Sequence, residues 1–115
     1  MIKLVSLMYR RPGTSMTEFR AYYEDHHVPL IVGLLPPLLD YRRNYASEQP
    51  FVRAGRGPTE RLFDVLTETV FESPVAYAAF QAALADPAIG PLVVADEKRF
   101  LDRAAMRSYL VDEVR

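Results

Sequence analysis

The sequence predicts an α+β fold in which a four-stranded antiparallel sheet carries both of its helices on one face. Two observations lead to this class. The expected elements follow the order strand, helix, strand, strand, helix, strand, which corresponds to split βαβ units. The 115 residues also contain no internal repeat and no linker-like stretch, so we expect a single domain over residues 1–115.

The first two elements are a strand and a capped helix. Residues 2–9, IKLVSLMY, are apolar and partly β-branched, and an Arg-Arg-Pro-Gly turn ends them. Ser15 then precedes Glu18 at the spacing of a capping box, so a helix is expected to begin near Met16. Because Pro29 disfavours helical geometry in the residue before it, this helix is expected to end close to the two adjacent histidines.

Two strands are expected in the middle of the chain, separated by a long loop. Residues 38–45, LLDYRRNY, alternate imperfectly and form the second strand. Residues 46–61 contain two glycines and two prolines and have little periodicity, which is typical of a loop. Residues 62–71, LFDVLTETVF, alternate clearly and are the third strand, with large apolar side chains on both faces.

The last elements are a helix, a shorter helix and a strand. Ser73 supplies an N-cap for an alanine-rich helix over residues 74–85, whose first residue is a proline. Prolines and a glycine within residues 87–91 break this helix. Residues 96–102 are expected to form a short helix, and residues 105–111 form the fourth strand.

One face of the predicted sheet has no helix to cover it. The first strand nevertheless carries large apolar groups on both faces, Ile2, Leu4 and Met8 on one and Val5, Leu7 and Tyr9 on the other. An exposed sheet face does not normally carry so many large apolar side chains. The simplest cover is the sheet of a second copy, so we expect a homodimer.

Composition excludes several classes of function. Fourteen basic and fifteen acidic residues give a net charge of −1, so nucleic acid is not an expected partner. Absence of cysteine excludes disulfides, thiolate nucleophiles and cysteine-bound zinc. The longest apolar stretch, residues 28–39, carries three prolines and is shorter than the ~20 residues of a membrane span. The N-terminal residues do not have the layout of a secretory signal, so we expect a cytoplasmic location away from membranes.

The two histidines, His26 and His27, are adjacent. Side chains of neighbouring helical residues diverge by about 100°, so only one is expected to face a cavity, and neither a metal site nor a cofactor is predicted. An imidazole can both take and give a proton near neutral pH. A histidine in the last turn of a helix can instead cap carbonyl groups. Both roles stay open for His27, whereas a structural role is favoured for His26. Asp96 and Glu97 are interpreted as surface or helix-start acids.

A longer motif surrounds the histidines. Phe19 to Leu30 follows Phe-x-x-Tyr-Tyr-x-x-x-His-x-Pro-Leu, and the segments DYRRNY, ADEKRFLD and AMRSYLVDE follow later. Together they resemble the EthD-like family of dimeric α+β barrel proteins, over nearly the whole chain except the loop at 46–61. The family's histidine falls on His27. This resemblance implies a ferredoxin-like fold, a dimer and a small apolar cavity between sheet and helices, but no particular reaction.

The favoured hypothesis is a cofactor-independent enzyme that acts on a small apolar cyclic or aromatic compound. His27 would be the acid/base in isomerisation, ring closure, dehydration or oxygenation, with His26 and Tyr23 as further catalytic candidates. Candidate substrate-binding residues are Phe19, Tyr41, Tyr45, Phe63, Phe80, Phe100 and Tyr109, although packing is the usual role of each aromatic ring. A non-catalytic binding or accessory protein of an oxidative degradation system and a purely structural dimerisation module are the alternatives.

Overall fold

A computed structural model of the chain describes residues 1–47 and 61–115. Its four strands form one antiparallel sheet in the order β2-β3-β1-β4, with β1 and β3 in the centre. The strands are β1 (Ile2–Met8), β2 (Asp40–Tyr45), β3 (Val65–Phe71) and β4 (Arg107–Val111). The predicted α+β, ferredoxin-like class is therefore confirmed. Most of the loop predicted over residues 46–61 lies outside the described residues.

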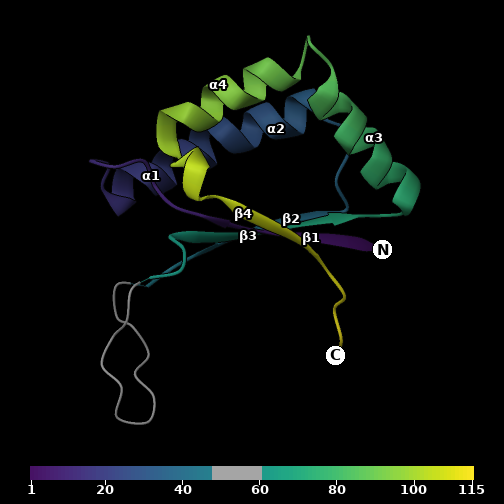
Figure 1. Ribbon diagram of the computed structural model, residues 1–115, viewed down its shortest axis with the longest axis horizontal. Coiled ribbons are helices and arrows are strands. Elements are labelled where there is room, and N and C mark those ends of the chain that lie inside the picture. The colour runs from purple at the N-terminus through teal and green to yellow at the C-terminus, as the bar shows by residue number, and fades with distance from the viewer. Residues whose placement is uncertain (48–60) are drawn as a thin grey trace.

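All helices lie on one face of this sheet (Figure 1). In chain order they are α1 (Met16–Tyr22), the π-helix η1 (Tyr23–His27), α2 (Val28–Leu34), α3 (Pro74–Ala85), α4 (Gly90–Phe100) and the short 3₁₀-helix η2 (Arg103–Ala105). No single helix of the described residues is long and apolar enough to cross a membrane. Helices α3 and α4 satisfy that test only as a pair, and they are bent by 81°.

The predicted capping box begins α1. The Ser15 hydroxyl accepts from the Glu18 amide at 3.1 Å and donates to the Glu18 carboxylate at 2.9 Å. The predicted end of this helix at the histidines is wrong, because the chain remains helical through η1 into α2. The amide of Val28 bonds to the carbonyl of Tyr23, five residues back. This π-turn places Pro29 in the first turn of α2, where the missing amide hydrogen is tolerated.

The prediction for the second half of the helical layer also needs a correction. Gly90 and Pro91 were expected to lie in a break before a short helix at 96–102, but they begin α4, which runs from Gly90 to Phe100. Pro91 fits there because a first-turn proline leaves no amide unpaired. Gly90 fits because a Cβ at this position would collide with the carbonyl oxygen of Leu84 at the end of α3.

Two clusters of apolar side chains join the sheet to the helices. One contains Phe19, Tyr23, Val65 and Phe100, together with Met8 and Leu101. The other contains Ile31, Leu35 and Val93. Alternation along the strands leaves a second set of apolar groups on the opposite face, which no helix covers (Figure 1). This set consists of Val5, Leu7, Leu66, Val70, Tyr109 and Val111.

Candidate functional site

A pocket of about 320 Å³ lies between the sheet and the helical layer. Its helical side is apolar, with Ile31, Leu35, Phe80 and Val93 among the lining residues. Apart from tyrosines, three lining residues are ionisable: His27, Glu97 and Arg103. Glu97 and Arg103 form an ion pair of 3.2 Å with each other. Among the described residues that line the pocket, the charges of Glu97 and Arg103 therefore balance each other.

His27 is the histidine that lines this pocket. Its side chain comes from η1 and the residue is only 3% exposed. Its Nδ1 lies 2.8 Å from Oδ2 of Asp96 in α4. The other ring nitrogen, Nε2, bonds to no described residue, yet no buried side-chain nitrogen or oxygen of the described chain lacks a partner. Nε2 therefore reaches accessible space, and His27 is one of the residues that line the pocket.

Asp96 is held in place from its other side by Tyr22. The Tyr22 hydroxyl donates to Oδ1 of Asp96 at 2.6 Å. Burial, followed by the hydrogen bond to Asp96, raises the pKa of Tyr22, so this phenol stays a donor at neutral pH. Both carboxylate oxygens thus have partners, which fixes the direction in which Asp96 accepts the hydrogen bond from Nδ1 of His27.

The π-turn explains how Tyr22 and His27 reach the same carboxylate. On a regular α-helix, two residues five positions apart point about 140° away from each other. In η1 the hydrogen bonds span five residues, so each turn holds an extra residue and positions 22 and 27 lie on one side. Such single π-turns are frequent at functional sites. Of the two histidines, His27 lines the pocket and His26 does not.

Two buried tyrosines extend the polar lining beyond His27. The Tyr23 hydroxyl lies 2.8 Å from Oγ1 of Thr67 and 3.3 Å from the Tyr41 hydroxyl. Burial raises the pKa of both Tyr23 and Tyr41. Both are therefore neutral phenols, which can donate hydrogen bonds but do not act as bases at neutral pH.

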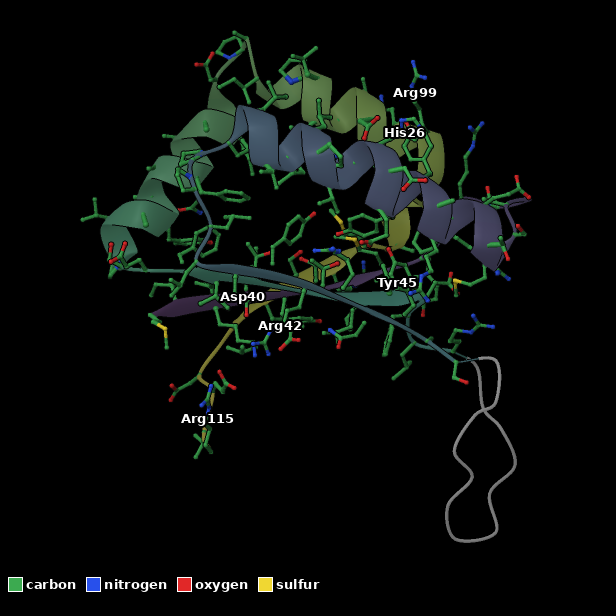
Figure 2. All side chains as sticks on the ribbon, turned by 180° about the vertical axis from the view of Figure 1, so that it is seen from behind. His26, Asp40, Arg42, Tyr45, Arg99 and Arg115 are labelled. Carbon is green, nitrogen blue, oxygen red and sulfur yellow. The ribbon has the colours of Figure 1, made fainter. Side chains whose placement is uncertain are left out.

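The catalytic candidates other than His27 lie in different surroundings. His26 is exposed and stacks on the Tyr22 ring with 4.9 Å between ring centroids. Figure 2 shows it in the helical layer, away from the sheet. Tyr23 is fully buried and borders the pocket, where its ring lies 5.4 Å from that of His27.

The seven candidate binding residues divide into three groups. Tyr41 and Phe80 line the pocket. Phe19, Tyr45 and Phe100 pack behind it, Phe100 against the His27 ring at 4.8 Å and Tyr45 with its hydroxyl on Glu24 at 2.6 Å. The other two are not brought to the pocket. Phe63 is half-buried ahead of β3, and Tyr109 lies on the uncovered face, because it pairs with Val5.

Several site residues were not identified from the sequence. Asp96 was interpreted as a surface or helix-start acid, which is wrong, since it lies in the middle of α4 and binds His27. The signal available in the sequence was the position of Asp96 in ADEKRF, one of the segments that carry the family resemblance. The hydroxyl groups of Ser6, Thr67, Thr69 and Ser108 also line the pocket. Serine and threonine in strands give no sign of this role, because threonine is common in strands for its shape alone.

No group of three or more histidine, cysteine, aspartate or glutamate side chains gathers into a metal site within residues 1–47 and 61–115. His27 and Asp96 instead form a hydrogen-bonded pair at the edge of the pocket, with the carboxylate on one ring nitrogen of the histidine.

Comparison with known proteins supports the same fold. The sequence profile of the EthD domain matches residues 11–104. The chain is similar to a solved Arabidopsis thaliana protein, with 17% identity, a TM-score of 0.64, and coverage of 100% of this chain and 97% of that one. It is similar to an ethyl tert-butyl ether (EthD) family protein of Bacillus halodurans, with 18% identity, a TM-score of 0.64 and coverage of 99% and 100%.

A third similar structure is HapK of Hahella chejuensis, with 13% identity, a TM-score of 0.63 and coverage of 99% of this chain and 93% of that one. At these identities the three likenesses show the fold alone. No curated protein matches the chain in sequence.

Proposed function

The chain belongs to the EthD family, and from this premise we propose that it is a cofactor-independent enzyme that moves a proton on a small, largely apolar cyclic or aromatic compound. The observation that carries the proposal is the bond between Nδ1 of His27 and Asp96, which leaves Nε2 of the same ring for the pocket. Positioned acid/base groups of this kind accelerate reactions by roughly 10²–10⁴-fold.

The chemistry follows from the hydrogen bond. A neutral His27 donates its Nδ1 hydrogen to Asp96, so the lone pair is on Nε2 and can accept a proton from a carbon or hydroxyl of the bound molecule. The imidazolium that forms is stabilised by the adjacent carboxylate. It then returns the proton to another carbon, which is isomerisation, or to a departing hydroxyl, which is dehydration.

The pocket supports a neutral, mainly apolar substrate. Its volume of about 320 Å³ is at the lower end of the range of about 300–1,000 Å³ for small-molecule sites. Glu97 and Arg103 neutralise each other, so no free charge attracts an ionic ligand. A buried Tyr41 phenol borders the same space and can donate to a substrate oxygen.

The test measures by NMR how fast the carbon-bound hydrogens of 2-cyclohexenone and 1-tetralone are exchanged for deuterium in D₂O. Wild-type protein should accelerate deuterium uptake next to the carbonyl, and His27→Ala should lower that rate by about 10²–10⁴-fold. His26→Ala is the matched control, because His26 is exposed on the far side of the helices, and it should keep the wild-type rate. Full exchange activity in His27→Ala would contradict the proposal.

A non-catalytic binding protein is the second candidate. It is favoured by the tight packing of the His27 ring against Phe100 and Tyr23, which is also what a structural histidine shows. This candidate predicts that ligands bind equally well to wild-type protein and to His27→Ala. It also predicts that neither protein accelerates deuterium exchange.

A further inference from the structure

Hydroxyl groups form a row across the face of the sheet that turns toward the helices. Ser108 of β4 pairs in register with Ser6 of β1, and Ser6 pairs with Thr67 of β3. Thr69 lies on the same face, two residues further along β3. The face of a sheet that packs on helices is normally apolar, yet Ser6, Thr67 and Thr69 are all buried there. All four residues line the pocket.

This row has hydrogen-bonding capacity that the protein leaves unused. Oγ of Ser6 and Oγ of Ser108 lie 2.9 Å apart, so one donates to the other and one hydroxyl hydrogen remains. Thr69 bonds through its side chain to no described residue. Because no buried side-chain oxygen of the described chain lacks a partner, the Thr69 hydroxyl must reach accessible space, which is the pocket that it lines.

The opposite side of the pocket has the reverse character. Ile31 of α2, Leu35 directly after α2 and Val93 of α4 present only hydrocarbon, and the Phe80 ring of α3 lies with them. Away from Tyr23, His27, Glu97 and Arg103, the helical side of the pocket is therefore apolar, whereas the sheet side carries the row of hydroxyl-bearing residues next to Leu4 and Met8. A molecule that satisfies both must itself be polar along one edge and apolar elsewhere.

We propose that the pocket recognises a ring compound with hydroxyl or keto oxygens along one edge, bound with those oxygens at Thr69 and the Ser6–Ser108 pair and with its carbon skeleton against α2 and α4. This inference rests on the proposed function and specifies its substrate class. A keto oxygen makes the C–H bonds next to its carbonyl acidic, because it takes the negative charge as the proton leaves, and an acidic C–H bond is the group on which His27 can act as a base.

The experiment is fluorescence titration with two probes of similar shape, 1,3-dihydroxynaphthalene and naphthalene. The chain contains no tryptophan, so naphthalene fluorescence is read against tyrosine alone. Wild-type protein should bind the dihydroxy compound about 10-fold tighter, because a neutral hydrogen bond is worth about 2- to 10-fold in affinity. Thr69→Val and the double variant Ser6→Ala/Ser108→Ala should each lower this preference by about 2- to 10-fold, with naphthalene binding unchanged.

Thr17→Val is the matched control, because Thr17 is exposed on α1, and it should keep the full preference. Circular dichroism checks that each variant is folded, and Thr69→Val keeps nearly the same side-chain shape. Equal affinity of wild-type protein for the two probes, no binding of either, or an unchanged preference in both hydroxyl variants would overturn the inference. His27→Ala should retain the preference, so the failure of catalysis is distinguished from the failure of recognition.

Discussion

His26 and His27 are neighbours in the chain and lie in opposite surroundings. The difference is made by η1 and by the position of Asp96. Only His27 has its ring between the helices and the sheet, where a carboxylate binds one nitrogen and leaves the other to the pocket. The ring of His26 packs on Tyr22 at the surface. At the scale of the residue, the proposed role of His27 in proton transfer therefore depends on its partner Asp96 and not on the imidazole alone.

Asp96→Asn tests this partnership. An amide can accept from Nδ1, but it cannot stabilise the imidazolium, so we expect exchange activity to fall by about 10²–10⁴-fold with ligand affinity retained. Nitrogen NMR of the ring should show the Nδ1-protonated tautomer of His27 in wild-type protein and a mixture in the variant. Tyr22→Phe removes only the second partner of Asp96 and should have a smaller effect on both measurements. If the tautomer of His27 and the exchange rate were both unchanged in Asp96→Asn, Asp96 would not be the functional partner of His27.

At the scale of the element, two glycines in the helical layer have opposite requirements. Gly90 begins α4 against the Leu84 carbonyl, whereas a Cβ added to Gly33 of α2 would extend into open space. Gly90→Ala should lower the free energy of unfolding by about 1–3 kcal/mol, because the corner between α3 and α4 must shift. Gly33→Ala should raise it by about 0.5–1 kcal/mol, since alanine is the better helix former. Urea unfolding measures both changes in the free energy of unfolding. Equal effects of the two substitutions would contradict the close approach of Gly90 to the Leu84 carbonyl.

An ion pair joins η1 to the sheet and gives a pH-dependent contribution to stability. Arg43 of β2 donates to both carboxylate oxygens of Glu24, at 2.9 and 2.7 Å. These hydrogen bonds hold the pKa of Glu24 below its usual value. The native state therefore binds fewer protons at this site than the unfolded state. The stabilisation is fully present above the unfolded pKa of about 4.3 and is lost as pH falls through the lower native pKa.

Glu24→Gln should consequently unfold at lower urea concentration than wild-type protein at pH 7, and the difference should shrink below about pH 4. Asp25→Asn is the control, because Asp25 is the exposed neighbour of Glu24 on the same element, and it should leave the curve close to wild type. A constant difference between Glu24→Gln and wild type from about pH 3 to pH 7 would show that the carboxylate does not contribute through its charge.

At the scale of the whole molecule, the uncovered sheet face remains to be explained. Tyr109 is 55% exposed there, beside Val5 of β1. The face also carries the charged pair of Lys3 with Glu68 and that of Arg42 with Asp40, the latter two labelled in Figure 2. Such a mixture of apolar and paired polar groups is suited to contact with another protein surface. The homodimer expected from the sequence, sheet against sheet, stays a proposal that fits this surface.

Tyr109→Glu tests the dimer directly. A charge on this face should weaken a sheet-to-sheet contact, so sedimentation should show a dimer for wild-type protein and a larger monomer fraction for the variant. Val75→Glu places the same charge at a position of α3 that is 79% exposed on the helical side, and it should sediment as wild type. A monomeric wild-type protein would refute the proposal.

Local signals in the sequence were sufficient for most elements of the fold. The capping box at Ser15, the alternation of β3 and the N-cap at Ser73 depend on residues only a few positions apart, and the structure contains all three. Prolines were the exception. Pro29 and Pro91 were interpreted as breaks, although a proline is equally compatible with the first turn of a new helix. Which of the two occurs depends on whether the following segment has a surface to pack on.

By itself, the sequence determined the order of the strands and helices along the chain and the apolar character of both sheet faces. It also identified His27 as a candidate acid/base residue. The tertiary structure alone decided that Asp96, 69 residues away, binds His27 and that hydroxyl groups of three strands meet beneath it. The physical reason is the range of the interactions. Capping and alternation are set by neighbours along the chain, whereas a buried hydrogen-bonded pair exists only after packing has brought distant elements together and excluded water from them.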